Sequence, residues 1–294
     1  MSDETRIVKQ AAAMISEDER GCFVHGDFFD LYGTFAGSRE YGVVNILNKI
    51  TQDLWNISTI IDRLDWMWHE SLKNDYLRQR WSSFVAVDIE HFHIEMRSIM
   101  DYVAELFAES LPARSQTPKS FERLINWIDK NPGAVGSEKD DLVRSAIWFN
   151  DILVIRNHTI HWGARTAVFE GPEEGILFQV HGDDIRQWLA QQSSFTVYNE
   201  NGVIYFDRYA TLYVSHLLVF LKNLSQIPIS VNHAPSSVGT TKNYSAGFCV
   251  IKGWMRKTIG ILESREAAYR LVAMSSCSEK AEEKGHRDRS SPSS

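Results

Sequence analysis

Two long runs of regularly spaced hydrophobic residues are the strongest pattern in the chain. Within residues 43–68, and again within residues 85–106, apolar side chains recur at alternating steps of four and three. This spacing places them on one face of a helix. Asn74 and Asp75 lie between the two runs and can break or cap the chain. Two such helices with a short connector predict an antiparallel helical hairpin.

An intermolecular coiled coil would show the same spacing. Several tryptophans close to these runs also need burial, which favours a folded hairpin over a coiled coil. These tryptophans are Trp55, Trp66, Trp68 and Trp81.

Shorter helical patterns follow the hairpin. Thr117 and Pro118 predict the start of a helix whose apolar positions end at Ile128, because threonine caps a helix and proline suits its first position. A further helix is expected over residues 138–163, where apolar residues keep a spacing of three and four. It ends at Gly163, because glycine suits the position just after a helix.

After residue 163 the pattern indicates short strands. Residues 166–170 and 176–180 flank a Gly-Pro-Glu-Glu-Gly segment, and residues 195–198 and 203–206 flank Asn-Glu-Asn-Gly. Both arrangements are typical of β-hairpins. The remaining expectations are a helix within residues 1–40 followed by a segment rich in glycine and phenylalanine, a short helix at 183–190, a helix at 209–224, a loop at 232–247 and a helix at 248–274.

The predicted fold class is therefore mainly α, an antiparallel helical bundle with a small β-hairpin appendage. The polar, serine-rich segment 275–294 is predicted to be a disordered tail. The predicted divisions are an N-terminal extension at 1–40, the helical bundle at 41–165, hairpins and a packing helix at 166–230, a loop and C-terminal helix at 231–274, and the tail at 275–294.

Composition and charge narrow the class of protein. Among 294 residues, 31 lysines and arginines stand against 38 aspartates and glutamates, a net charge of −7, so the chain is not a general polyanion binder. Three scattered cysteines do not make a disulfide framework or a zinc knuckle. The first 20 residues are too charged for a signal peptide, and the apolar run 209–221 is too short to span a bilayer. We expect a cytoplasmic protein without membrane contact.

The sequence lacks the motifs of several common enzyme sites. It has no GxGxxG, no Walker loop, no HExxH and no GxSxG, so no cofactor and no metal are expected. His91 and Glu95 are four residues apart on a predicted helix and could hold a metal together with a histidine of a later helix. The alternative is a polar helix edge.

A second polar cluster lies near the end of the predicted helix 138–163. Asn157 and His161 share one helix face, whereas Arg156 lies about 140° from His161 around a straight helix. Arg156 and His161 could meet through the arginine's reach, a distorted helix end or a second subunit. The helix dipole favours a protonated His161, which can transfer protons, and an arginine can bind phosphate. These groups suit metal-free RNA cleavage by the 2′-hydroxyl, which DNA lacks.

The segment from Arg156 and Asn157 to His161 resembles the R-x(4–6)-H motif of the HEPN superfamily, which commonly has a polar residue after the arginine. HEPN proteins are all-α bundles in which two long antiparallel helices precede the motif helix, and the predicted helices come in that order. Residues 95–102 also resemble the long helix of some HEPN-like families. The resemblance covers about residues 40–165.

The resemblance implies a homodimer in which two motifs face each other. Many HEPN domains are metal-independent endoribonucleases of toxin, antiphage or stress-response systems, so RNA is the expected substrate and a cognate inhibitor or partner protein is expected. Arg156 would bind the scissile phosphate, His161 would assist proton transfer, and Asn157 would position both. His158, and Glu95 or Asp101 from an earlier helix, are the supporting candidates.

Other interpretations of the same residues stay open. Arg156 could pair with a carboxylate while His161 caps the helix end, and the chain would then be a non-catalytic helical interaction module of a defence or regulatory complex. The net charge of −7 favours a structured or partner-delivered RNA over broad RNA binding.

Overall fold

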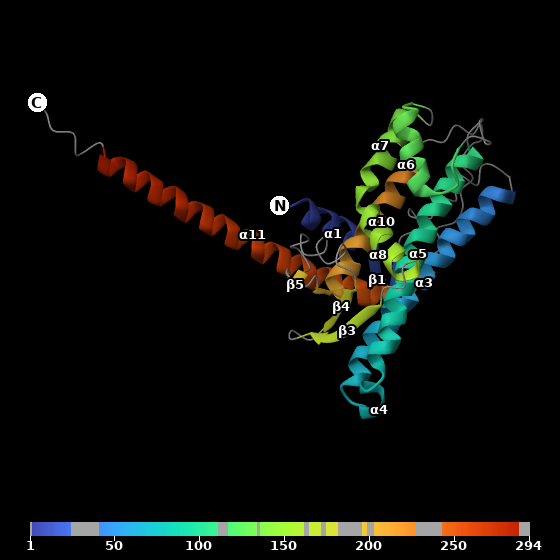
Figure 1. Ribbon diagram of the computed structural model, residues 1–294, viewed down its shortest axis with the longest axis horizontal. Helices are drawn as coiled ribbons and strands as arrows, with labels where there is room; N and C mark the ends of the chain where they lie inside the picture. Colours follow the sequence, from blue (N-terminus) through green and yellow to red (C-terminus); the bar gives the residue numbers. More distant parts are fainter. Residues whose placement is uncertain are drawn as a thin grey trace, which may run out of the picture.

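The computed structural model describes residues 2–24, 41–110, 117–133, 136–161, 165–171, 175–181, 196–198, 203–226 and 243–287. This part of the chain is mainly helical with two small antiparallel sheets, so the predicted mainly-α class is confirmed (Figure 1). The helices are α1 (Asp3–Met14), α3 (Tyr41–Ser71), α4 (Asp75–Arg78), α5 (Trp81–Ser110), α6 (Phe121–Lys130), α7 (Ser137–Ser145), the 3₁₀ turn η2 (Ala146–Trp148), α8 (Phe149–His161), α10 (Phe206–Gln226) and α11 (Ala246–Arg287).

The two long predicted helices are α3 and α5, which run antiparallel and side by side (Figure 1). The connector contains the single turn α4, whose backbone amides at Tyr76 and Leu77 donate to the side chain of Asn74. The expected cap at Asn74 is therefore confirmed. The apolar positions of both seams are buried, including Leu64 and Phe92 at 0% exposure. The hairpin thus offers a continuous apolar face against which other elements of the chain pack.

The predicted burial of all four tryptophans is wrong for Trp66, and Trp55 is only half-buried. Trp68 and Trp81 are buried and their rings meet edge to face at 5.5 Å. Trp66, in contrast, is 57% exposed. Trp66 lies two positions after the fully buried Leu64. Side chains two positions apart on a helix point about 200° apart, so Leu64 and Trp66 cannot both face the core.

The helix predicted to start at Thr117 starts instead at Phe121. The amide of Phe121 donates to Oδ1 of Asp101 at 2.9 Å, so a carboxylate on α5 caps α6 in place of a local threonine. The predicted start is wrong because the cap comes from a residue distant in sequence, which local cap signals do not include.

Both predicted hairpins are present. The strands are β1 (Ile15–Asp18), β2 (Gly21–Val24), β3 (Thr166–Gly171), β4 (Gly175–Val180), β5 (Thr196–Tyr198), β6 (Val203–Tyr205) and β7 (Asn243–Tyr244). One sheet has the order β3-β4-β6-β5, with β3 paired to β4 and β5 paired to β6. The short helix predicted at residues 183–190 lies outside the described residues.

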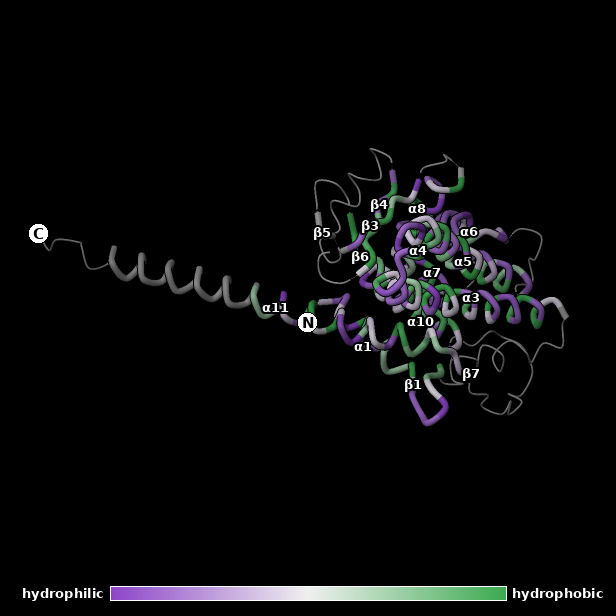
Figure 2. The backbone as a smooth tube through the Cα atoms, turned by 90° about the horizontal axis from the view of Figure 1, so that it is seen from below, coloured by the Kyte–Doolittle hydropathy of each residue, from purple (hydrophilic) through white to green (hydrophobic). Residues whose placement is uncertain are grey.

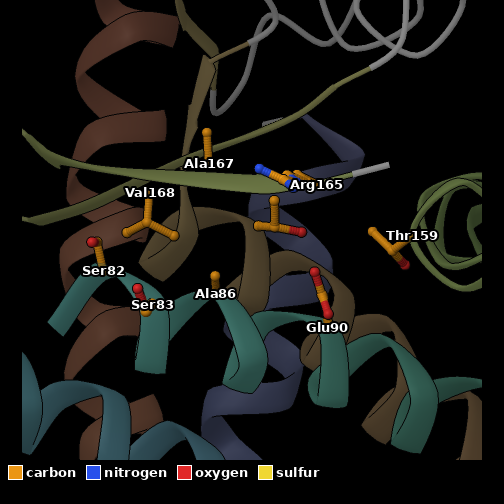
Figure 3. A pocket seen from close by; sticks show the side chains of 9 residues that line it. Ser82, Ser83, Ala86, Glu90, Thr159, Arg165, Ala167 and Val168 are labelled. Atoms are coloured by element: carbon orange, nitrogen blue, oxygen red, sulfur yellow. The ribbon is translucent and has the colours of Figure 1, made fainter. Parts of the chain in front are cut away.

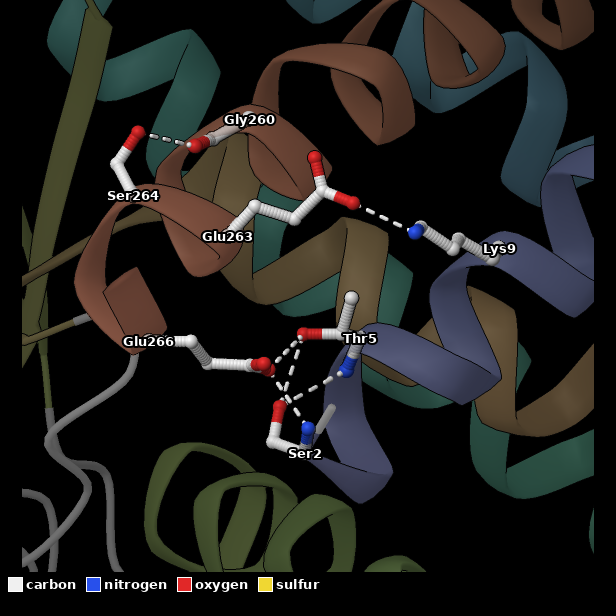
Figure 4. Close-up of polar contacts among 7 residues, drawn as sticks. All are labelled: Ser2, Thr5, Lys9, Gly260, Glu263, Ser264 and Glu266. Carbon is white, nitrogen blue, oxygen red and sulfur yellow. Dashed lines mark hydrogen bonds and ion pairs between the residues drawn. The ribbon is translucent and has the colours of Figure 1, made fainter. Parts of the chain in front are cut away.

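A second sheet, of order β1-β2-β7, was not expected from the sequence. It joins the segment after α1 to residues 243–244, which were predicted as loop. Strands this short show no alternating pattern of their own. The first residues are also tied to α11 (Figure 4): the Thr5 hydroxyl donates to Glu266 at 2.8 Å, and Lys9 pairs with Glu263 at 2.5 Å.

The last helix is longer than predicted. α11 begins at Ala246 and its backbone stays helical to Arg287, past residue 275, where the predicted tail begins. The disordered tail stays a prediction, and residues 288–294 lie outside the described part. Each added residue of an existing helix gains a hydrogen bond without a new nucleus, and the segment contains alanine, glutamate and lysine, which favour helices. The part beyond the body projects away from it (Figure 1).

One apolar core joins α1, α3, α5, α8, α10 and the first turns of α11. The five divisions of the chain expected from the sequence stay a prediction. Polar and apolar stretches alternate along these helices (Figure 2). α11 crosses α3 so closely that a Cβ atom at Gly247 would lie 1.9 Å from the carbonyl oxygen of Ser58. Among the described residues, no helix combines the length and the apolar character needed to cross a membrane.

Candidate active site

The residues of the predicted motif lie on α8, which is shorter than the helix predicted at 138–163. The 3₁₀ turn η2 separates it from α7. The turn brings two consecutive side chains inward: Trp148 is 8% exposed and stacks on His216 at 5.6 Å, and Phe149 is fully buried. The break between α7 and α8 therefore lies where two aromatic rings pack into the core.

Arg156 and Asn157 contact each other on α8. Nη1 of Arg156 donates to Oδ1 of Asn157 at 3.3 Å. The pKa of Arg156 is lowered, first by burial and then by the nearby guanidinium of Arg97, whereas Asp101 raises it. The motif arginine therefore lies close to a second arginine, which is on α5. Arg97 is not among the site residues predicted from the sequence.

Asp101 contacts both Arg97 and the first residue of α6. Its Oδ2 lies 3.4 Å from Nε of Arg97, while its Oδ1 accepts from the amide of Phe121. The Arg97 and Asp101 side chains are 23% and 29% exposed, so the cluster is open to solvent on one side. We call Arg97, Asp101, Arg156 and Asn157 the arginine cluster. Asp101, predicted as a supporting residue, is near enough to Arg156 for its charge to raise the pKa of that arginine.

His158 and His161 both lie in the last turn of α8. His158 is 7% exposed, and its Nδ1 hydrogen-bonds to the carbonyl oxygen of Val154 at 2.8 Å. His161 is the last residue of α8, one turn beyond Asn157, and its side chain lies outside the described part. The backbone therefore sets His161 at the helix end, where a positive charge interacts favourably with the helix dipole.

Glu95 lies on the side of α5 that faces α3. Nδ2 of Asn56 donates to it at 3.2 Å, and His91 lies 3.6 Å away. Its other neighbour is Asp53, whose pKa is raised to about 7 by burial and then by the charge of Glu95 and a hydrogen bond to it. We call Asp53 and Glu95 the carboxylate pair. Glu95 is thus engaged with α3, and its described contacts do not include Arg156.

Among the described side chains, no further ligand accompanies His91 and Glu95 to complete a metal site. No group of three or more histidine, cysteine, aspartate or glutamate residues in the described part of the chain could hold a metal ion. His91 is an exposed partner of Glu95, in keeping with a polar helix edge.

An open groove of about 550 Å³ adjoins the last turn of α8 (Figure 3). Glu90 from α5, Thr159 from α8 and Arg165, just before β3, are on its walls. Thr166 also lines it, and its hydroxyl is buried with no hydrogen-bond partner within the described residues. The groove lies between α5 and β3 and reaches Thr159 of α8, whereas the arginine cluster lies where α5 faces α8.

Comparison with protein-family models, with curated proteins and with solved structures finds no match to this chain.

Two features of the site could not be seen in the sequence, Arg97 and Asp53. Arg97 is four residues before Asp101, a spacing that indicates an ion pair on a helix, but nothing local indicates that Arg156 lies beside it. Asp53 is one of several acidic residues on α3, and its contact with Glu95 depends on how the hairpin pairs.

Proposed function

We propose that the chain is a metal-independent endoribonuclease of the HEPN type, active as a homodimer in which the two α8 helices face each other. The arginine cluster is the observation that carries this proposal. The charge of Arg97 lowers the pKa of Arg156, and an anion bound near both guanidinium groups would offset that repulsion. Arginine pairs suit a phosphate because guanidinium groups bind its oxygens bidentately.

The chemistry assigned to the site is attack of a ribose 2′-hydroxyl on the adjacent phosphorus. The 2′-oxygen loses its proton and bonds to phosphorus, and the 5′-oxygen leaves and gains a proton, which produces a 2′,3′-cyclic phosphate. Arg156 and Arg97 would stabilise the extra negative charge of the pentacoordinate phosphorus, and Asn157 would orient Arg156. His161 would transfer a proton at the 2′-oxygen or the leaving oxygen.

The surroundings of the cluster support an RNA substrate in two ways. The groove beside α8 provides an open surface for nucleotides next to the scissile bond, lined by hydroxyl groups and Arg165. The remainder of the acidic chain disfavours general nucleic-acid binding, so a structured or partner-delivered RNA fits best. A cytoplasmic toxin or antiphage system with a cognate inhibitor belongs to the same proposal.

One observation favours the second candidate, a non-catalytic helical interaction module. Asp101 lies beside Arg97 and also caps α6, which is what a purely structural cluster would do. In that case the exposed apolar residues along the hairpin, Trp66, Phe84 and Val87, would bind a partner protein.

The experiment that separates the two candidates is incubation of the purified protein with total RNA in a chelator, followed by mapping of the cut ends. We expect cyclic phosphate ends, and a loss of at least about 100-fold in rate for Arg156→Ala and for His161→Ala. Arg144→Ala and His69→Ala are matched controls, because both residues are exposed and lie outside the cluster. They are expected to cleave within about twofold of wild type.

Cleavage by Arg156→Ala at the wild-type rate would contradict the catalytic proposal. Absence of cleavage by every variant, together with capture of a protein partner that Trp66→Ala or Phe84→Ala weakens, would support the interaction module instead.

A further inference from the structure

Cys22 and Cys249 come together where β2 meets the first turn of α11, although they are far apart in the sequence. The backbone amide of Cys22 donates to Sγ of Cys249 at 3.1 Å. The carbonyl oxygen of Cys22 accepts from the amide of Ser245, also at 3.1 Å. The sulfur of Cys249 therefore occupies the place where a further residue of β7 would continue the pairing with β2.

The thiols of Cys22 and Cys249 lie in different environments. Cys22 is 2% exposed, and its pKa is raised to about 12, mainly by burial and then by a hydrogen bond to the Cys249 side chain. Cys249 is exposed. A reagent in solution thus reaches Cys249 directly and reaches Cys22 only through Cys249.

We propose that Cys22 and Cys249 form a redox-active dithiol that reacts with small disulfides such as glutathione disulfide. An exposed thiol beside a buried second thiol is the arrangement that converts a mixed disulfide into an internal one. This inference is independent of the proposed ribonuclease activity, because neither cysteine belongs to the arginine cluster or to the groove.

The reaction has two exchanges. The Cys249 thiolate attacks one sulfur of the small disulfide, the S–S bond breaks, and one small thiol leaves with a proton. Cys22 then loses its proton to water, and its sulfur attacks Sγ of Cys249 and displaces the second small thiol. The protein gives up two electrons and two protons, which reduce one small disulfide to two thiols.

The third cysteine cannot take part in this way. Cys277 lies on the same helix as Cys249, between seven and eight turns further along and so about 40 Å away. A bond between Cys22 and Cys249 would join the N-terminal sheet covalently to the start of α11, next to the close crossing of Gly247 over Ser58. Closing so long a loop lowers the entropy of the unfolded chain.

The test is to incubate the full chain with glutathione disulfide and to measure its intact mass and its tryptic peptides. We expect a mass loss of about 2 Da and a cross-linked pair of peptides, residues 21–39 and 243–252, that dithiothreitol separates. The thermal midpoint should rise by about 5 °C in the oxidised form.

Serine variants identify the role of each thiol. Cys22→Ser should stop at the mixed disulfide, with a mass gain of about 305 Da on Cys249, and in Cys249→Ser the Cys22 thiol should stay unmodified while the protein is folded. Cys277→Ser is the control and should form the cross-link as wild type does. The proposal is overturned if wild type also stops at the mixed disulfide, or if the cross-linked peptides contain Cys277.

Discussion

Each of two sides of α5 carries a pair of like charges: an acidic pair faces α3 and a basic pair faces α8. Toward α3, the buried carboxylates of Asp53 and Glu95 lie together, and the pKa of Asp53 rises to about 7. Toward α8, the guanidinium of Arg97 lies near Arg156, and the pKa of Arg156 falls. Glu95 and Arg97 are only two residues apart, so the helix itself directs them to opposite sides.

The carboxylate pair and the two arginines relieve the repulsion between their like charges by different means. A carboxylate pair relieves its repulsion by binding a proton, which water supplies. An arginine keeps its proton at any ordinary pH, so two neighbouring guanidinium groups need an anion. Asp101 supplies one negative charge from within the chain, and the partly exposed side of the arginine cluster remains open to a phosphate.

Of the changes considered, removal of Arg97 should have the largest effect, and it should act on RNA cleavage and anion binding. Arg97→Ala is expected to lower RNA cleavage by about 100-fold, because one of the two groups that stabilise the pentacoordinate phosphorus is lost. The same variant should weaken binding of inorganic sulfate, measured as the rise in thermal midpoint with sulfate at constant ionic strength. Arg144→Ala is the control for both measurements. An unchanged sulfate response in Arg97→Ala would remove the anion site from the arginine cluster.

The carboxylate pair should make stability depend on pH. Because the pKa of folded Asp53 is raised from 3.8 to about 7, its protonated form is favoured, and this contribution to stability is lost as pH rises through 7. Asp53→Asn removes the titration, so at pH 8 the variant should be more stable than wild type by about 1–3 kcal/mol. At pH 4 the difference should vanish. Chemical denaturation at both pH values measures it.

Asp62→Asn is the control for this pH dependence, since Asp62 is a partly exposed carboxylate on the same helix. If its stability curve follows that of Asp53→Asn, the pH dependence does not come from the carboxylate pair.

Asp101 permits the smallest and most selective change. Asp101→Ala should lower the free energy of unfolding by about 1 kcal/mol, because the amide of Phe121 loses its acceptor. Asp101→Asn keeps an oxygen acceptor but removes the charge, so it should cost less stability and strengthen sulfate binding several-fold. Equal stability losses in the two variants would mean that the charge, and not the cap, is what Asp101 contributes.

The sequence predicted the elements whose signals are local and repeated. The seams of α3 and α5 and the hairpin of β3 and β4 follow from spacing alone. The start of α6 and the sheet of β2 and β7 depend on residues far away in the chain, so local patterns missed them. At the site the same limit applies: the motif spacing selected Arg156 and the family resemblance suggested Asp101. The effect of Arg97 on Arg156 depends on how α8 packs against α5.

The crossing of α11 over α3 has a consequence for how the chain folds. Ser58 and Ser245 meet there with their hydroxyl oxygens 2.5 Å apart, across 187 residues of sequence. Contacts between such distant residues form slowly because a long loop must close first, whereas α3 and α5 are nearly consecutive and can pair early. During synthesis, the N-terminal sheet therefore lacks its third strand until the ribosome has made β7, whereas the α3–α5 hairpin can pair before that.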